Sequence, residues 1–309
     1  MLSMVFDRDY KILERERKKT KLQDGNGVTV ERIIKVIKNS LQASGTNNSA
    51  PSGIGIGAPG TLDLAKGVIR EAPNLGWKNV PLKELLQKEF SCDVVISNDV
   101  DAGVYGEYCF GAAQKGKTVL GIFPGTGIGG GLVFNGQLYT SNNNSCMEIG
   151  HFPIVTDGPL CGCGRYGCLE AVASRLAIST TAAAAVYRGE APALQKIAGT
   201  DISEIRSGAL AESIKQGDKK IEQIVRNAAR YLGKAIGGVI NLLAPDTVIL
   251  GGGLVEAMPE IFLSEIEATA KKFVMPTYEG SYKIKTAKLG DDATAMGAAA
   301  WARKIIEKT

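Results

Sequence analysis

The chain has 309 residues, which is long for one hydrophobic core and sufficient for two domains. Its net charge of +4 is too small to indicate binding to nucleic acid or an anionic membrane, and its 44% hydrophobic and 22% charged residues are ordinary for a globular protein. No apolar run approaches the roughly 20 residues of a transmembrane helix, and the first ten residues lack the apolar core of a signal peptide. Free thiols at Cys92, Cys109 and Cys146 fit a reducing compartment, so we expect a cytoplasmic protein with neither a membrane nor a nucleic-acid partner.

The first ninety residues predict alternating strands and helices. Residues 1–22 are predicted to form two extended segments around a turn, with the basic residues of the second segment on a solvated strand face rather than in a nucleic-acid patch. Apolar spacing predicts a helix from Thr29, and the sequence GIGIG at 53–57 predicts a short buried strand. A helix is predicted at Pro81–Phe90.

A polar pair, Asn98 and Asp99, follows the next predicted strand at 93–97, and a helix is predicted at 101–110. Open α/β sheets keep their binding and catalytic residues at the carboxyl ends of strands. The pair is therefore a candidate site, although two such residues also make an ordinary helix cap.

Two glycine-rich turns follow predicted strands. The first contains Gly125, Thr126, Gly127 and Gly129, between predicted strands at 118–123 and 132–134, beyond a polar linker at 111–117. It resembles the second phosphate loop of the actin, hexokinase and Hsp70 superfamily, where backbone N–H groups cradle phosphate oxygens. It matches neither the Walker phosphate loop nor the dinucleotide-binding fingerprint. The alternative is a tight hairpin, which also uses glycine-rich sequence.

The second turn, Gly251, Gly252 and Gly253, follows a predicted strand at 246–250. In the superfamily the corresponding turn borders the adenosine, and we favour that interpretation over a βα turn that merely needs small residues. Between the two turns, residues 171–220 are predicted to be helical, and 221–243 a long helix that Pro245 stops.

The segment from 148 to 170 contains the only histidine, His151, and three of the six cysteines, Cys161, Cys163 and Cys168. The spacing is His-x9-Cys-x-Cys-x4-Cys, and glycines at 162, 164 and 167 allow a short loop to fold back. Three thiolates and an imidazole are the ligands of a closed tetrahedral zinc site, so the sequence predicts structural rather than catalytic zinc. The alternative is a loop with ordinary buried cysteines.

Glu148 and Glu170 bracket this loop, and here the sequence resembles the ROK family (repressors, open reading frames and sugar kinases). The family signature, Glu-x-Gly-His and then Gly-x-x-Cys-x-Cys-Gly-x-x-Gly-Cys-x-Glu, is matched throughout this segment. The resemblance implies that the two glutamates and the zinc-bound His151 also contact a sugar. It further implies that the turns containing Gly60 and Asn74 border the sugar, although Asn74 is equally well a plain turn residue.

The resemblance implies phosphoryl transfer from ATP with Mg²⁺ to a hexose hydroxyl, with Asp99 as catalytic base and Asn98 as a sugar ligand. Glucose is the family's commonest acceptor, so a glucokinase is the first expectation, with fructose, mannose, allose and N-acetylmannosamine open. A sugar-responsive repressor is the alternative from another class, but the chain shows no N-terminal winged helix–turn–helix pattern.

The implied fold class is α/β, with two ribonuclease H-like domains and a cleft between them. The predicted domains are 1–113 together with 293–309, and 114–292, with a hinge helix at 289–300. We also expect a homodimer or a larger homo-oligomer.

The family's first phosphate loop, Asp-x-Gly-Gly-Thr-Lys, has no counterpart, because no Asp-Gly-Gly-Thr occurs in the 309 residues. The first strand of the N-terminal domain is therefore missing from the sequence as given. We expect the natural product to begin about 10–15 residues earlier, enough for a strand and its turn. Otherwise, the chain would be a catalytically weak or inactive sugar-binding protein.

Overall fold

The structure is a computed structural model, and it divides into two compact units. Unit 1 comprises Met1–Lys115, Leu132–Cys146 and Asp291–Thr309, and unit 2 comprises Gly116–Gly131 and Met147–Gly290. The described residues are 1–19, 25–46, 50–72, 75–141 and 146–308, with only the backbone described for 25–29. Among them, no helix is long and apolar enough to cross a membrane. The predicted domain ranges stay a prediction.

Unit 1 begins with an antiparallel hairpin of β1 (Leu2–Phe6) and β2 (Ile12–Arg17), as the sequence predicted. The turn forms because a carboxylate oxygen of Asp7 accepts hydrogen bonds from the backbone N–H groups of Asp9 and Lys11, both at 2.9 Å. Helix α1 (Gly25–Ala43) follows and contacts both strands.

Strand β3 (Ile54–Ala58) pairs in parallel with β7 (Val94–Asn98), and α2 (Leu82–Phe90) lies between them in sequence. Among the described strands, β3 pairs only with β7, and β1 only with β2. The strand expected upstream of Met1 stays a prediction. The core beneath these elements contains Leu62, Ile69, Trp77, Leu86 and Ile96, each at most 4% exposed.

A further sheet in unit 1 lies where only turns were predicted. Strands β4 (Thr61–Asp63), β5 (Val68–Ala72) and β6 (Trp77–Val80) form an antiparallel three-stranded sheet. Each strand has at most five residues, too few for a clear alternating pattern, and the sheet is stabilised by burying Ile69 and Trp77.

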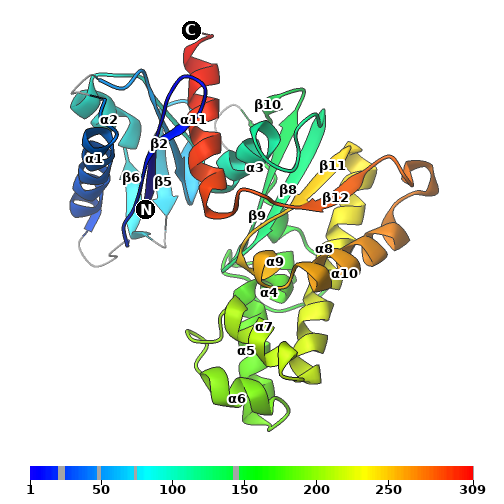
Figure 1. Ribbon diagram of the computed structural model, residues 1–309. Helices are drawn as coiled ribbons and strands as arrows, with labels where there is room; N and C mark the ends of the chain where they lie inside the picture. The colour runs from blue at the N-terminus through cyan, green and yellow to red at the C-terminus, as the bar shows by residue number, and fades with distance from the viewer. Residues whose placement is uncertain (20–24, 47–49, 73–74, 142–145, 309) are drawn as a thin grey trace. The chain divides into compact units, whose positions relative to one another are not determined.

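Helix α3 (Asp99–Cys109) and the final helix α11 (Ala293–Ile306) lie side by side and almost touch backbone to backbone (Figure 1). A Cβ atom added at Gly297 would lie 1.7 Å from the Ala102 carbonyl oxygen, and one at Gly106 would lie 2.3 Å from the Ala293 carbonyl oxygen. Only glycine permits this approach. The helix predicted at 289–300 is thus present, shifted towards the C-terminus, and its role as a hinge stays a prediction.

A five-stranded sheet has the order β10-β9-β8-β11-β12, in which β11 is parallel to both β8 and β12. The strands are β8 (Thr118–Pro124), β9 (Ile128–Phe134), β10 (Gln137–Leu138), β11 (Thr247–Leu250) and β12 (Lys283–Thr286). Strand β9 begins at Ile128 and not at the predicted residue 132, so Gly129 lies inside the strand and the turn itself is only Gly125–Gly127.

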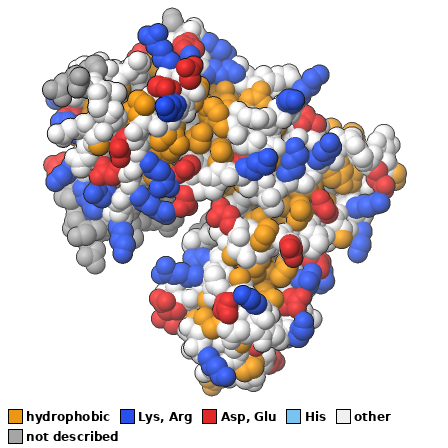
Figure 2. Space-filling view, in the orientation of Figure 1, with side chains coloured by type: hydrophobic (Ala, Val, Ile, Leu, Met, Phe, Trp, Pro, Cys, Tyr) orange, Lys and Arg blue, Asp and Glu red, His pale blue; other side chains and the backbone are white. Residues whose placement is uncertain are grey.

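The helices of unit 2 occupy most of residues 169–273. They are α4 (Leu169–Ala173), α5 (Arg175–Tyr187), α6 (Pro192–Ala198), α7 (Ser207–Lys215), α8 (Lys219–Leu243), α9 (Gly253–Ala257) and α10 (Pro259–Phe273). The long predicted helix is α8, which ends at Leu243 and is capped by Ala244, a residue with φ of +44° directly before Pro245. On the face shown in Figure 2, Lys and Arg side chains are interspersed with Asp and Glu and do not form one basic patch.

Candidate functional site

The four predicted zinc ligands converge in unit 2. The Sγ atom of Cys161 lies 3.7 Å from Nδ1 of His151, and the Sγ atoms of Cys163 and Cys168 are also 3.7 Å apart. All four ligand atoms lie within 4.8 Å of one another. Cys161 and Cys168 are buried, whereas His151 and Cys163 are exposed.

These separations fit zinc. With Zn–S bonds of about 2.3 Å and a Zn–N bond of about 2.0–2.1 Å, a tetrahedron has S···S edges of about 3.8 Å and an S···N edge of about 3.6 Å. The donor set of three thiols and one imidazole is full, which leaves no position for a reacting water. The arrangement suits a structural ion, and Nε2 of His151 stays available for another partner.

The loop that carries the cysteines closes through backbone contacts at glycine. Gly164 and Gly167 have φ of +83° and +74°, and a Cβ atom at Gly167 would lie 1.8 Å from the Val155 carbonyl oxygen. The Gly167 carbonyl accepts hydrogen bonds from the N–H groups of Ile154 and Val155. Gly162 has open space around it and no positive φ, so the loop does not require glycine there.

Both predicted glutamates flank this cluster, but they have different surroundings. Glu148 is exposed, and its carbonyl accepts a hydrogen bond from the His151 N–H at the short 3₁₀ turn Ile149–His151. Glu170 is half-buried in α4, where Oε2 accepts a hydrogen bond from the Ile128 N–H at 2.9 Å and Oε1 lies 3.8 Å from the Cys161 Sγ. Glu170 therefore joins the zinc loop to the first glycine turn.

The two glycine turns lie next to each other because their strands do. Leu250 of β11 is paired with Ile122 of β8, so Gly251–Gly253 and Gly125–Gly127 follow neighbouring strand ends. A Cβ atom at Gly252 would lie 2.8 Å from the Pro124 carbonyl oxygen. Of the other predicted nucleotide residues, Thr126 is exposed at the turn and Gly129 lies within β9.

In unit 1, Asn98 and Asp99 occupy the carboxyl end of β7, and the first of them is also a helix cap. Oδ1 of Asn98 accepts hydrogen bonds from the N–H groups of Val100 and Asp101, so α3 begins at Asp99 and not at the predicted residue 101. Burial raises the pKa of the Asp99 carboxyl, although a hydrogen bond from the Val100 N–H partly opposes the shift. A carboxylate with a raised pKa is better suited to accept a proton.

A contact behind Asp99 has no signal in the sequence. The Thr294 hydroxyl of α11 donates a hydrogen bond to the Asp99 carbonyl at 3.0 Å, and its methyl group faces Gly57. No local pattern signals this, because the two residues are 195 positions apart. Gly60 lies at an exposed turn with φ of +93°, whereas Asn74 lies outside the described residues.

A cavity of about 570 Å³ lies beside the cluster of His151 and the three cysteines in unit 2. Cys161 and Glu170 line it on the side of the cluster, and Thr126 contributes from the first glycine turn. Residues of α5 and α8 complete the wall, Tyr231 among them. Its volume is in the range of small-molecule sites.

Known proteins of one family are similar to this chain over most of its length. A family model described as "ROK family" matches residues 1–305. The glucokinase of Thermotoga maritima is 34% identical over 299 residues, which covers 96% of this chain and 92% of that protein. The xylose repressor of Caldicellulosiruptor bescii is 28% identical over 267 residues, covering 86% of this chain and 66% of the repressor.

Among solved structures, a ROK family glucokinase from Streptomyces griseus in complex with glucose and AMPPNP is similar with a TM-score of 0.83 and 29% identity. The match covers 97% of this chain and 95% of that one. The predicted α/β fold of the hexokinase kind is thereby confirmed.

Proposed function

We propose, from the premise that this chain belongs to the ROK family, that it transfers a phosphoryl group from ATP to a hexose hydroxyl, with glucose as the first candidate. The observation that carries the proposal is the adjacency of the two glycine turns at the ends of β8 and β11. Two turns without side chains at neighbouring strand ends let a polyanionic ligand approach backbone N–H groups closely. The glucokinase relatives support the same reaction class.

In this reaction, Asp99 accepts the proton of the attacking sugar hydroxyl, and its raised pKa makes it a stronger base than an exposed carboxylate. Asn98, Glu148, His151 and Glu170 are the proposed sugar ligands. When bound, ATP would supply the phosphoryl group, and Mg²⁺ would neutralise part of the phosphate charge. Fixing the sugar hydroxyl near the phosphate provides much of the rate enhancement.

Structural zinc would be held by His151, Cys161, Cys163 and Cys168. The His151 imidazole would be held through Nδ1, which would leave Nε2 free to exchange a hydrogen bond with a sugar hydroxyl. The zinc loop also positions Glu170, whose carboxylate supports the first glycine turn.

The direct test is an assay of ADP release in the presence of ATP, Mg²⁺ and one sugar at a time. The panel contains glucose, mannose, fructose, allose and N-acetylmannosamine. We expect turnover above the sugar-free rate, highest with glucose. Absence of turnover with every sugar, in protein that binds both glucose and AMPPNP, would leave a sugar-binding protein of weak or no catalysis.

A second candidate function is sugar-responsive regulation, which the similarity to the xylose repressor favours. The chain spans 66% of that repressor, so the match does not by itself indicate DNA binding. The two functions separate in the same assay, because a regulator binds its sugar without releasing ADP.

A further inference from the structure

Helix α5 starts directly against the first glycine turn. The backbone N–H of Arg175 donates a hydrogen bond to the Gly125 carbonyl at 2.9 Å. The guanidinium of the same residue donates through Nη2 to Oγ1 of Thr126 at 3.0 Å. Arg175 therefore contacts two successive residues of the turn, once through its backbone and once through its side chain.

The charge of this guanidinium has no acidic partner among the described residues. By contrast, Arg188, one position beyond the other end of α5, forms an ion pair with Glu190 at 3.0 Å. In α8, Arg226 lies within 3 Å of both Glu222 and Glu265. Arg175 is half-buried, and the one hydrogen bond that its side chain forms with the described residues is to the neutral hydroxyl of Thr126.

The other end of the turn is held by a carboxylate. Oε2 of Glu170 accepts from the Ile128 N–H, and a Cβ atom at Gly127 would lie 2.2 Å from that oxygen. The turn is thus fixed between Glu170 on one side and Arg175 on the other. Glu170 already has a backbone partner, so the unpaired positive charge lies on the side of Thr126.

The second glycine turn lies beside the same point. Gly252 packs against the Pro124 carbonyl, one residue before the Gly125 carbonyl that Arg175 contacts. A planar guanidinium with several N–H donors is well suited to bind phosphate oxygens, and it cannot be deprotonated in a protein.

We propose that Arg175 is a phosphate ligand of the donor nucleotide, held over the first glycine turn by Thr126. This inference rests on the proposed function, and it adds a residue that lies outside the glycine-rich motif. The ligand class is a nucleoside triphosphate rather than a nucleoside, because the recognised groups are phosphate oxygens.

The test compares Arg175→Gln and Arg175→Lys with Arg188→Gln as a matched control near the other end of the same helix. The KM for ATP, the KM for glucose and the affinities for AMPPNP and adenosine are measured in the full chain. We expect Arg175→Gln to raise the KM for ATP and to lower the affinity for AMPPNP, each about 10–100-fold, which is the usual effect of losing a hydrogen bond to a charged group. Adenosine affinity and the KM for glucose should change little, and Arg175→Lys should recover part of the loss.

If the affinities for adenosine and AMPPNP fell equally, Arg175 would have only a structural role. An unchanged KM for ATP would also refute the proposal. A melting temperature close to that of the native protein excludes misfolding of the variant. Failure of the proposed function has a different signature, since the native protein would then bind AMPPNP without phosphorylating any sugar. If the native protein does not bind AMPPNP, the inference is also wrong.

Discussion

At the residue scale, Asp99 combines two properties that favour proton acceptance. It is half-buried, which raises the pKa of its carboxyl, and it is held in place by the Val100 N–H and by the contact of its carbonyl with Thr294. Because the folded protein binds this proton more tightly than the unfolded chain does, ionised Asp99 lowers stability at neutral pH. That cost is absent below the pKa of the unfolded chain.

Replacing Asp99 with Asn should therefore separate activity from stability. We expect turnover to fall about 10²–10⁴-fold through loss of the base, while the melting temperature at pH 7 stays equal or rises. In the native protein, kcat should decline as the pH falls through the raised pKa of Asp99. Asp93→Asn, at an exposed position just before β7, is the control and should retain both properties. Unchanged turnover of Asp99→Asn would remove this residue from the mechanism.

The zinc ligands make a second prediction at this scale. Elemental analysis of the purified protein should give one zinc per chain, and Cys163→Ser should lose most of it, since Ser is a poor replacement for a thiolate. Structural zinc contributes about 10–16 kcal/mol in small zinc peptides, so we expect strongly reduced stability. Cys92→Ser, which changes a cysteine outside the cluster, should keep its zinc. Native protein free of zinc after gentle purification would contradict the assignment.

At the scale of elements, the backbone contact between α3 and α11 fixes the helix that carries Asp99. Gly297→Ala would place a methyl group against the Ala102 carbonyl, where the backbone cannot move without shifting a helix. We expect a loss of about 1–3 kcal/mol or more in the free energy of unfolding, measured by urea denaturation.

Gly238→Ala is the matched control for this change, because Gly238 lies in α8 and an added Cβ would have no atom within 4 Å beyond its own turn of helix. There the better helix propensity of alanine should stabilise the protein by up to about 1 kcal/mol. Similar effects of the two changes would show that helix propensity, and not packing, governs Gly297.

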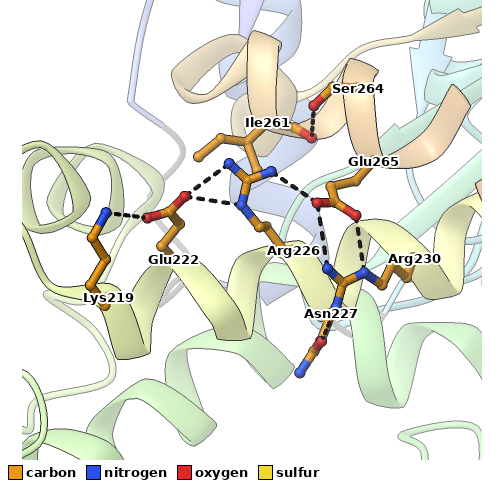
Figure 3. A network of polar contacts seen from close by, with 8 residues as sticks. All are labelled: Lys219, Glu222, Arg226, Asn227, Arg230, Ile261, Ser264 and Glu265. Atoms are coloured by element: carbon orange, nitrogen blue, oxygen red, sulfur yellow. Dashed lines mark hydrogen bonds and ion pairs between the residues drawn. The ribbon is translucent and has the colours of Figure 1, made fainter. Parts of the chain in front are cut away.

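A second contact between elements joins α8 to α10 through charged side chains (Figure 3). Glu265 of α10 accepts hydrogen bonds from Arg226 at 2.9 Å and from Arg230 at 3.0 Å. Burial acts to raise the pKa of Glu265, but the two arginines outweigh it and hold the pKa below its usual range. The ion pairs therefore stabilise the fold above the unfolded pKa, and this contribution is lost as the pH falls through the folded pKa.

Glu265→Gln should lower the free energy of unfolding by about 1.5–3 kcal/mol at pH 7, the range for hydrogen bonds to charged groups. The difference from the native protein should shrink as the pH is lowered past the ordinary glutamate pKa of about 4.3. Denaturant titrations at several pH values measure both. The exposed Glu267→Gln on the same helix is the control, and a difference independent of pH would contradict the ionic origin.

At the scale of the whole molecule, the tryptophans and the candidate zinc ligands belong to different units. Both tryptophans, Trp77 and Trp301, belong to unit 1, and Trp301 packs on Tyr105 with ring centroids 5.1 Å apart. The four candidate zinc ligands all belong to unit 2. Tryptophan fluorescence therefore reports on one unit, whereas the candidate zinc site lies in the other.

Removal of zinc by a chelator should separate the two unfolding transitions. We expect the melting curve followed by far-ultraviolet circular dichroism to gain an early phase from the helices of unit 2, while the tryptophan fluorescence transition moves much less. Re-addition of zinc should restore a single curve. Equal shifts of both signals would show that the units unfold as one cooperative body.

The sequence by itself indicated a candidate zinc site, because the four candidate ligands lie within eighteen residues and their spacing fits one short loop. It also placed Asn98, Asp99 and both glycine turns at strand ends, and it predicted α2 and α8 from apolar periodicity. Such features depend on neighbours in sequence, so a single chain is sufficient to recognise them.

Only the tertiary structure decided which of these features meet. It set the two glycine turns side by side, brought Arg175 to Thr126 across 49 positions, and brought Thr294 to the Asp99 carbonyl across 195. It also formed the sheet β4-β5-β6, whose strands are too short to show a pattern of their own. Contacts of this kind depend on the packing of distant segments, which no local spacing of residues encodes.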